Sequence, residues 1–478
     1  MNLTLRSPLA ASPAVRSAAL ALFLGTLLHN TGCTKSGASD AGSGGAGGAS
    51  HASSSSASSS TGGAATSTSS ASGTGGSAAS TTASSSSGST PPGPGYYVSP
   101  GGSDASDGLS PSTPFKTLEK AQTSMRASST LKTTYLMTGT FARTAVLALT
   151  SADSGESWLA APSATPVLDG GGTVAEAFTV SGSSITLRWL TLQNFASIGI
   201  LGEGGSQLLI DSNTIQNILC TGFNQGGVVI LGSAADVTIS HNLVKKSNYS
   251  GIMAANSAGD TRSNLHIESN AIYDVCLTVA DCGGLYADDR NHSATGTLIT
   301  HNIVGNYGPV ANQTKAIYLD DEESNVTVEN NIVYGTGQWA LQVHGGDHDV
   351  FQNNVFDISA AAQLGLYQYD GPTASNYGMA GNVFSCNIVY SSSAPPSSLW
   401  TYSVVSADVP PAVSKNLYWD AKGAFSNSGS IVDSSPTVAN PGFVDPATSN
   451  YAFASAPPSF CAAFVPIDTS GVGPLPNL

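Results

Sequence analysis

The chain has 478 residues and a formal net charge of −15 at pH 7, with 16 Lys and Arg residues in total. This balance offers no basic footprint for nucleic acid, and it weakens the case for a strongly polyanionic substrate. The length allows two or three domains, but the composition of the first fifth is not that of a folded domain.

Residues 1–33 have the pattern of an export signal. Arg6 and Arg16 charge its front, and the apolar run Ala18–Leu28 is too short to span a membrane as a mature helix. The small residues before Cys33 resemble a bacterial lipoprotein cleavage site, which implies lipidation of that cysteine. Plain secretion and a retained anchor are the alternatives. We expect an exported protein, either secreted or displayed as a lipoprotein on the bacterial cell surface or outer membrane.

Residues 34–95 are built almost entirely from Ser, Gly, Ala and Thr. Such a segment cannot bury enough apolar surface to offset its ordering entropy, so we predict a disordered linker. A flexible coil of about 60 residues spans roughly 40 Å root-mean-square. The linker would hold a domain away from a membrane, which the protein would contact only through a lipid at Cys33.

A strand, a turn rich in Gly and Asp, and a helix are predicted for residues 96–132. Thr113 is the expected helix cap, and Phe115, Leu118 and Ala121 would share one helix face. The stretch 96–121 resembles the leader of many secreted right-handed parallel β-helix proteins of the pectate-lyase-like superfamily, where it caps the first coil. The resemblance implies carbohydrate-active relatives and an architecture, and it names no activity.

One asparagine recurs at intervals of 29, 28, 32, 29, 23 and 33 residues, each time after a short strand pattern. A period of this size with two or more strands per unit predicts an all-β solenoid, a single-stranded parallel β-helix, which we place at 133–440 with a C-terminal cap or tail at 441–478. We expect each asparagine to adopt the left-handed turn conformation and to hydrogen-bond from coil to coil. The asparagines are Asn213, Asn242, Asn270, Asn302, Asn331, Asn354 and Asn387.

A six-residue strand pattern also recurs, and two copies end in paired carboxylates: Gly284–Asp289 and Ala316–Asp321. Side chains alternate between the faces of a strand, so we expect the second and fourth positions to point into the core and the third and fifth to point outward. The predicted inward column at the second position is Ile200, Val228, Ile252, Leu285, Ile317, Leu341 and Leu366.

The outward fifth position carries Asp288, Asp320 and His344 on successive coils, about 4.8 Å apart by strand spacing. We predict these three as catalytic residues, with two acids on the floor of a groove and an imidazole that tunes one of them. Asp289 and Asp321 end the same two strands. Taken singly, each aspartate also fits a turn on a solvated corner.

Aromatic and basic residues surround this column. The third position gives a predicted rail of tyrosines, and Trp339 is expected in the loop before the His344 strand. Crowded carboxylates repel one another, so a proton, a cation or a neighbouring base must compensate them. The predicted substrate-binding residues are Tyr286, Tyr318, Tyr367, Trp339, Lys315 and Arg290.

The cysteines fit an exported protein. Cys276 and Cys282 are close enough in sequence to form a disulfide in the loop before the first acidic strand. The pairing of Cys220, Cys386 and Cys461 stays open, and no CxxC metal pattern is present.

Three functions remain in competition. A glycoside hydrolase would use Asp288 and Asp320 as acid and nucleophile or base and would require no cofactor. A polysaccharide lyase acting on a uronic acid polymer would instead hold Ca²⁺ with the carboxylates, Asp289 and Asp321 included, and would use Lys315 or Arg290 as base. A non-catalytic glycan-binding surface protein fits the tether equally well. In each case we expect a monomer with a polysaccharide partner.

Overall fold

The computed structural model describes residues 93–478, except 258, 371–377 and 405–408. The predicted export signal with Cys33, and nearly all of the predicted linker, lie outside the described residues. No helix within the described ranges is long and apolar enough to cross a membrane.

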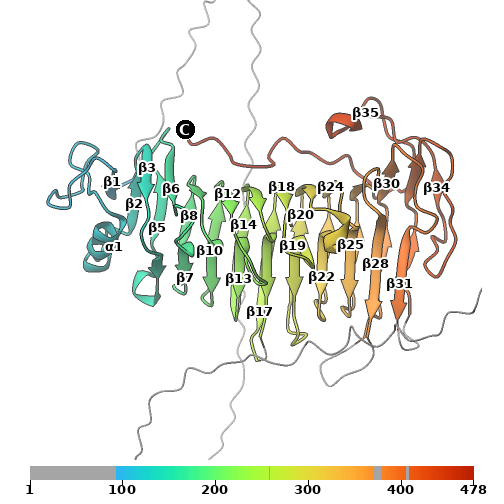
Figure 1. Cartoon of the computed structure of the whole chain (residues 1–478), viewed down its shortest axis with the longest axis horizontal. Helices are drawn as coiled ribbons and strands as arrows, with labels where there is room; N and C mark the ends of the chain where they lie inside the picture. Colours follow the sequence, from blue (N-terminus) through green and yellow to red (C-terminus); the bar gives the residue numbers. More distant parts are fainter. Residues whose placement is uncertain (1–92, 258, 371–377, 405–408) are drawn as a thin grey trace, which may run out of the picture. The chain divides into compact units, whose positions relative to one another are not determined.

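Three parallel sheets form the body of the fold, together with the helix α1 (Leu118–Ala127) (Figure 1). Sheet 1 contains β1 (Tyr96–Val98), β2 (Thr133–Leu136), β5 (Ser157–Ala160), β8 (Thr186–Arg188), β11 (Leu209–Asp211), β14 (Ala234–Ser240), β17 (Arg262–Glu268), β20 (Leu298–Thr300), β23 (Thr327–Glu329), β26 (Val350–Gln352), β29 (Val383–Ser385) and β32 (Ala412–Ser414). Sheet 2 contains β4 (Leu147–Leu149), β7 (Glu176–Val180), β10 (Ile198–Glu203), β13 (Gly226–Leu231), β16 (Ser250–Ala255), β19 (Cys282–Asp288), β22 (Thr314–Asp320), β25 (Trp339–His344), β28 (Gln363–Tyr369) and β31 (Trp400–Val404).

Sheet 3 contains β3 (Gly139–Ala142), β6 (Pro166–Asp169), β9 (Thr191–Gln193), β12 (Thr214–Ile218), β15 (Leu243–Ser247), β18 (Ala271–Val275), β21 (Ile303–Tyr307), β24 (Ile332–Tyr334), β27 (Val355–Asp357), β30 (Ile388–Ser391), β33 (Leu417–Asp420) and β34 (Thr437–Val438). A separate antiparallel pair is formed by β35 (Phe443–Asp445) and β36 (Asn450–Phe453). Short 3₁₀ turns occupy Ser151–Asp153, Val310–Asn312 and Pro446–Thr448.

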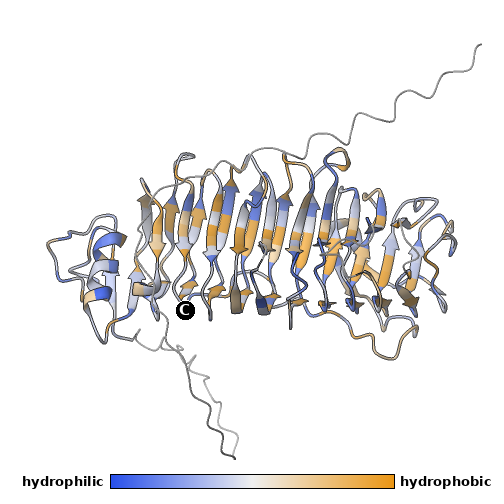
Figure 2. Cartoon of the chain, turned by 90° about the horizontal axis from the view of Figure 1, so that it is seen from below, coloured by the Kyte–Doolittle hydropathy of each residue, from blue (hydrophilic) through white to orange (hydrophobic). Residues whose placement is uncertain are grey.

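Along most of the stack, each strand pairs in parallel with the strand three places further along the chain. Each coil therefore gives one strand to each sheet, which is the arrangement of a parallel solenoid. The predicted right-handed parallel β-helix is confirmed as the fold class. Hydrophobic residues run along the strands of successive coils (Figure 2).

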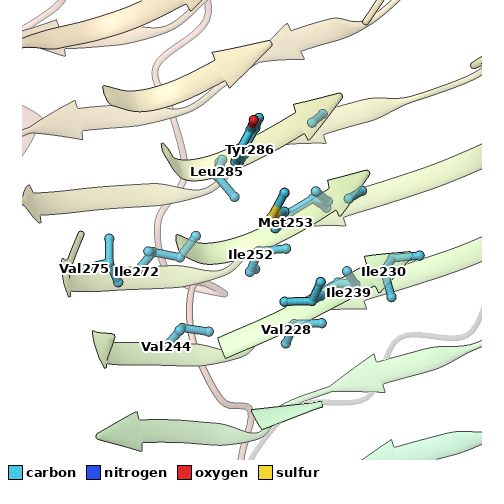
Figure 3. Packing of buried hydrophobic residues seen from close by; sticks show 14 of the residues in the cluster. Val228, Ile230, Ile239, Val244, Ile252, Met253, Ile272, Val275, Leu285 and Tyr286 are labelled. Atoms are coloured by element: carbon cyan, nitrogen blue, oxygen red, sulfur yellow. The ribbon is translucent and has the colours of Figure 1, made fainter. Parts of the chain in front are cut away.

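The core is the inside of this stack, and the predicted inward column forms it over six coils. Backbone pairing joins Ile200 to Val228 and continues through Ile252, Leu285 and Ile317 to Leu341. Leu285 and the next residue, Tyr286, leave the same strand on different sides, as do Ile252 and Met253 (Figure 3). The predicted alternation thus holds where the two acidic strands lie.

The predicted register is wrong by one residue at β28. Gly365, and not Leu366, pairs with Leu341, because the ring of Trp400 from the next coil fills the space where a side chain at Gly365 would stand. Tyr367 consequently pairs with Val343 at an inward position and is buried in the core.

The asparagines form a continuous internal ladder. The side-chain oxygen of each accepts hydrogen bonds from the backbone and side-chain nitrogens of the asparagine one coil earlier, as Asn242 does from Asn213 at 2.9 and 3.0 Å. The left-handed conformation, however, falls on the residue before each asparagine, such as Ser212 (φ 56°) or His241 (φ 52°). Our assignment of that conformation to the asparagines was wrong: the preceding residue makes the bend, and the asparagine then points inward.

The leader differs from the prediction in where its helix begins. Thr117 is the N-cap of α1, and its hydroxyl accepts from the backbone nitrogen of Lys120 at 3.2 Å. Thr113 instead donates to Asp107 at 2.6 Å, and Phe115 bridges to Val98 in an extended conformation. Leu118 and the other buried residues of α1 cover the start of the core.

The segment after β34 folds back over sheet 3 and runs along the stack toward its first coils (Figure 1). A disulfide joins Cys461 to Cys386, and Val465 exchanges two hydrogen bonds with Asn353. Further on, the side-chain amide of Asn477 donates to the carbonyl of Ala161 at 2.8 Å. We call residues 461–478 the strap.

Candidate active site

The two acidic strands place their carboxylates side by side on the outer face of sheet 2. Asp288 ends β19, Asp320 ends β22, and the two residues are direct backbone partners. Two positions earlier, Tyr286 and Tyr318 stack with ring centroids 4.7 Å apart and planes inclined by 11°. His344 ends β25 on the next coil, so residues predicted from one outward column meet in one cluster.

Asp320 is the hub of the hydrogen bonds in this cluster. Its Oδ2 accepts from the hydroxyl of Tyr286 at 2.6 Å, and its Oδ1 lies 2.7 Å from Nδ1 of His344. The backbone nitrogen of Asp321 donates to the same Oδ1 at 3.0 Å. Three donors around a buried carboxylate favour its charged form.

Asp288 has different surroundings. Its Oδ2 lies 3.2 Å from a guanidinium nitrogen of Arg290, while its buried Oδ1 has no hydrogen-bond partner within the described part of the chain. A buried carboxylate oxygen without a donor favours the protonated acid, which can supply its own hydrogen. The two aspartates are thus chemically inequivalent although the sequence writes them alike.

The pKa values of the pair shift in opposite directions. Burial, aided by the charges of Asp320, Asp321 and Glu323 and opposed by Arg290, raises the pKa of Asp288 to about 7. Burial alone would also raise the pKa of Asp320, but the hydrogen bond and charge of His344 hold it below its usual value. An acid and a carboxylate therefore stand on neighbouring coils near neutral pH.

His344 is the cation that compensates Asp320. Burial opposes its charged form, yet the hydrogen bond and charge of Asp320 outweigh that effect and raise the pKa of His344 to about 9. Its other nitrogen, Nε2, lies 3.2 Å from a carboxylate oxygen of Asp370. At neutral pH the imidazole is therefore a charged donor.

Arg290 and Asp321 are the exposed members of the acidic cluster. The exposed fraction of the side chain is 56% for Arg290 and 34% for Asp321, against 7% for Asp320 and 3% for Asp288. Nε of Arg290 donates to Asp321 at 2.7 Å, so the guanidinium bridges the two acidic strands. The acids themselves are nearly buried, and this ion pair is the exposed part of the cluster.

Asp289 is engaged in the loop that follows β19. Its carboxylate accepts from the side chain of Asn256 at 2.9 Å, from the backbone nitrogen of Ser293 at 2.5 Å and from that of Ala294. These bonds fix the loop and leave Asp289 turned away from the rest of the cluster's hydrogen bonds. It therefore acts as an organiser of the chain in this structure.

Of the residues described, Asp320, Asp321 and His344 form the one group of three metal-ligand types with ligand atoms within 4.8 Å of one another. The donor set does not fit Ca²⁺, which takes six to eight oxygen ligands. One ligand is an imidazole nitrogen, and Arg290 and the charged His344 already neutralise the carboxylates. The predicted calcium ligands Asp289 and Asp321 are committed to other partners.

The remaining predicted substrate-binding residues lie beside the tyrosine stack or inside the core. The Nζ of Lys315 pairs with Asp281 at 2.6 Å and lies 4.0 Å from the ring centroid of Tyr318. Trp339 is the first residue of β25 and not a loop residue, with Lys315 5.8 Å from its ring. Tyr367 takes an inward position in the shifted register of β28, so it cannot extend the outward rail. Tyr286 and Tyr318 keep their outward positions but are also buried, with 6% and 3% of their surface exposed. Cys276 and Cys282 are joined by a disulfide, and Cys282 is the first residue of β19.

Sequence reasoning missed the support beneath the pair. Arg262, buried at the start of β17, forms an ion pair with Glu323 and donates to the backbone carbonyl of Asp288 at 3.1 Å. No local sequence pattern predicts that Arg262 is buried or that it contacts Asp288, 26 residues later. Asp370 stands at the sixth position of the strand pattern in the sequence, but the shifted register of β28 places it one residue beyond the positions of Asp289 and Asp321.

The comparisons agree with this fold. Residues 176–357 match the family model described as a right handed beta helix region, so the expected right-handed parallel β-helix architecture is confirmed. No curated protein sequence matches the chain.

Among solved structures, the chain is similar to a lacto-N-biosidase from Eubacterium ramulus, with 12% identity over 72% of this chain and 68% of that one and a TM-score of 0.46. It is also similar to the A-module of a mannuronan C-5 epimerase from Azotobacter vinelandii, with 14% identity, coverage of 67% and 94% and a TM-score of 0.44. An alginate lyase from a Paenibacillus species gives 14% identity, coverage of 63% and 91% and a TM-score of 0.36. At these identities the likeness concerns the fold alone.

Proposed function

We propose that the chain is an exported carbohydrate-active enzyme that cleaves a polysaccharide at the Asp288–Asp320 pair, acting as a glycoside hydrolase. The observation that carries this proposal is the opposite shift of two paired carboxyl pKa values on neighbouring coils. Acid-assisted cleavage of a glycosidic bond needs one protonated and one charged carboxyl group on either side of that bond.

In this mechanism Asp288 donates its proton to the leaving oxygen. Asp320, held by Tyr286 and His344, stays charged and attacks or stabilises the positive charge that develops at the sugar carbon. Adjacent parallel strands lie about 4.8 Å apart, close to the roughly 5–5.5 Å carboxyl separation of retaining enzymes. Retention of the anomeric configuration is therefore expected.

A lyase acting on a uronic acid polymer is the second candidate, and the half-exposed guanidinium of Arg290 favours it, because it could pair with a substrate carboxylate. The two candidate bases, Arg290 and Lys315, do not favour a lyase. The carboxylates around Arg290 raise its pKa against the opposing effect of burial, and Lys315 is buried against Asp281.

The experiment is an activity screen on neutral and uronic polysaccharides, with and without chelator, that follows reducing ends and the ultraviolet absorbance of unsaturated chain ends. We expect new reducing ends without absorbance, insensitive to chelator, and at least a hundredfold lower rate for both Asp288→Asn and Asp320→Asn. Absorbance that disappears with chelator would establish a calcium-dependent lyase instead. Binding without any cleavage across the panel would leave a glycan-binding protein.

Export and anchoring through Cys33 are part of the same proposal, on the strength of the N-terminal composition. The wild-type chain should be found in the membrane fraction of expressing cells, whereas the Cys33→Ser variant should be found in the soluble fraction. Equal partition of the two proteins would exclude lipidation.

A further inference from the structure

A groove lies on a different face of the stack, away from the Asp288–Asp320 pair. Two cavities of about 490 and 400 Å³ adjoin along the outer face of sheet 3 and share Tyr334, Ser449 and Tyr451 in their walls. Neither cavity is lined by any residue of the sheet 2 cluster. The sheet 3 groove, as we call both cavities together, therefore needs its own explanation.

The floor of the sheet 3 groove is one outward column of the β-helix. Backbone pairing aligns Tyr273, Gly305, Tyr334, Asp357 and Tyr390 on five successive coils. The glycine has a visible purpose, because a Cβ at that position would stand 2.6 Å from Cζ of Tyr334. The ring of Tyr334 thus lies along the sheet, over the neighbouring coil, in place of a side chain there.

The opposite wall is the β35–β36 pair, which is fixed in place. The hydroxyl of Tyr451 donates to Asp357 at 2.8 Å, and its ring centroid lies 5.8 Å from that of Tyr334. Phe443 meets the ring of Tyr390 edge-on at 5.6 Å. The tyrosine rings are therefore held in defined orientations on both sides of the groove.

The lining has the chemistry of a neutral, polyhydroxylated ligand. It mixes tyrosine rings with small polar groups, and none of the lining residues in either cavity is a lysine or an arginine. Asp357 and Asp445 would repel an anionic chain. Aromatic faces combined with a few placed hydrogen-bonding groups suit sugar rings, which have apolar faces and hydroxyl edges. The small polar residues are Asn306, Thr336, Ser359 and Ser392.

We propose that the sheet 3 groove binds a neutral polysaccharide chain, separately from the sheet 2 site. The choice of a carbohydrate rests on the proposed function, and the choice of a neutral one rests on the charges of the lining. The groove holds substrate polymer on one face of the stack while the acids act on another. It would raise affinity for long chains and leave the cleavage of short ones unchanged.

The test uses the full chain with Asp320→Asn to prevent turnover, and affinity electrophoresis in gels containing xylan, mixed-linkage β-glucan, galactomannan or polygalacturonate. We expect a neutral polymer to retard the protein, Tyr334→Ala to weaken that binding at least tenfold, and Tyr334→Phe to keep it within about threefold, because stacking needs only the ring. Gly305→Ala, which displaces the ring of Tyr334 without removing it, should also weaken binding.

The control is Tyr97→Ala, which removes a partly buried tyrosine of β1 that packs against Tyr135 and lies outside the groove lining. It should bind as the parent does. Circular dichroism and thermal melting establish that each variant is folded. Unchanged binding in both folded Tyr334→Ala and Gly305→Ala, retardation by polygalacturonate alone, or no retardation by any polymer would overturn the proposal.

The outcome is separable from that of the proposed function. With the acids intact, Tyr334→Ala should cleave short oligosaccharides at the wild-type rate while losing rate on polymer. A protein that cleaves nothing but still loses binding in Tyr334→Ala would contradict the hydrolase and support the groove. Normal cleavage with unchanged binding would do the reverse.

Discussion

Two aspartates written identically in the sequence have opposite roles because their neighbours differ. Asp320 receives three donors, whereas one oxygen of Asp288 receives none among the described residues. The Asp-Asp ending and the alternation of the strand predicted that these side chains would meet. The assignment of the proton depends on Arg290, Glu323 and His344, which come from three different coils, so it required the structure.

The raised pKa of Asp288 makes stability depend on pH. Between about pH 4 and pH 7 Asp288 keeps its proton in the folded chain and loses it in the unfolded chain. The contribution of Asp288 to the free energy of unfolding should therefore fall as the pH rises through this interval. Asp288→Asn removes the titration. We expect this variant to be more stable than wild type at pH 8 by on the order of 4 kcal/mol, with the difference vanishing toward pH 4. Urea denaturation at a series of pH values measures it.

The control for this prediction is Asp370→Asn, at an exposed carboxylate beside His344. It should show no such trend, because the loss of a charge at an exposed position costs little. Burial also raises the pKa of Glu156 to about 7, and that residue contributes the same kind of slope to every variant. Equal slopes in wild type and Asp288→Asn would therefore contradict the assignment of the proton to Asp288.

At the scale of elements, the sequence repeat predicted the architecture, but it did not predict the exact register of every strand. Period, strand number and the inward column follow from spacing alone, because stacked coils must present equivalent residues at equivalent places. The register at β28 did not follow. There Gly365 matched the first position of the strand pattern. In the structure it takes an inward position, where the ring of Trp400 from the next coil occupies the space beside it. The left-handed bend was likewise assigned one residue late, since spacing locates a turn without showing which residue turns.

The asparagine ladder should be a major source of stability. Asn302 is fully buried, accepts two bonds from Asn270 and donates to Ile267, Thr300 and Asn331. Replacing it with alanine leaves several buried groups without partners, so we expect Asn302→Ala to cost about 2–4 kcal/mol in the free energy of unfolding.

A matched comparison is available on the outer face. Gln216 also bonds across coils, to Gln193 at 3.0 Å, but it is only partly buried. Gln216→Ala should cost about 0.5 kcal/mol or less, because water replaces the lost bond. Chemical denaturation measures the free energy of unfolding of both variants. Equal losses in Asn302→Ala and Gln216→Ala would contradict the asparagine ladder as a major source of stability.

At the scale of the whole described domain, two disulfides constrain very different lengths of chain. Cys276 and Cys282 are 6 residues apart, while Cys386 and Cys461 are 75 apart and tie the strap to the stack. Closing a longer loop removes more entropy from the unfolded chain, roughly 4 kcal/mol against 2 for these lengths.

We therefore expect Cys386→Ser with Cys461→Ser to lower the melting temperature more than Cys276→Ser with Cys282→Ser. Conversely, activity should suffer more from the second pair of substitutions, because Cys282 is the first residue of β19, the strand that ends in Asp288. Calorimetry and rate measurements on both double variants decide this, and a larger thermal loss from the short loop would contradict the entropic argument.

The strap also fixes an order of events during synthesis. Asn477 bonds to Ala161, a partner 316 residues earlier in the chain. At 5–20 residues per second, the ribosome needs roughly 15–60 s to make the intervening stretch. During that interval the carbonyl of Ala161 lacks its hydrogen bond from Asn477. The first coils thus gain this contact only late in synthesis, which would suit the export that we propose from the N-terminal composition.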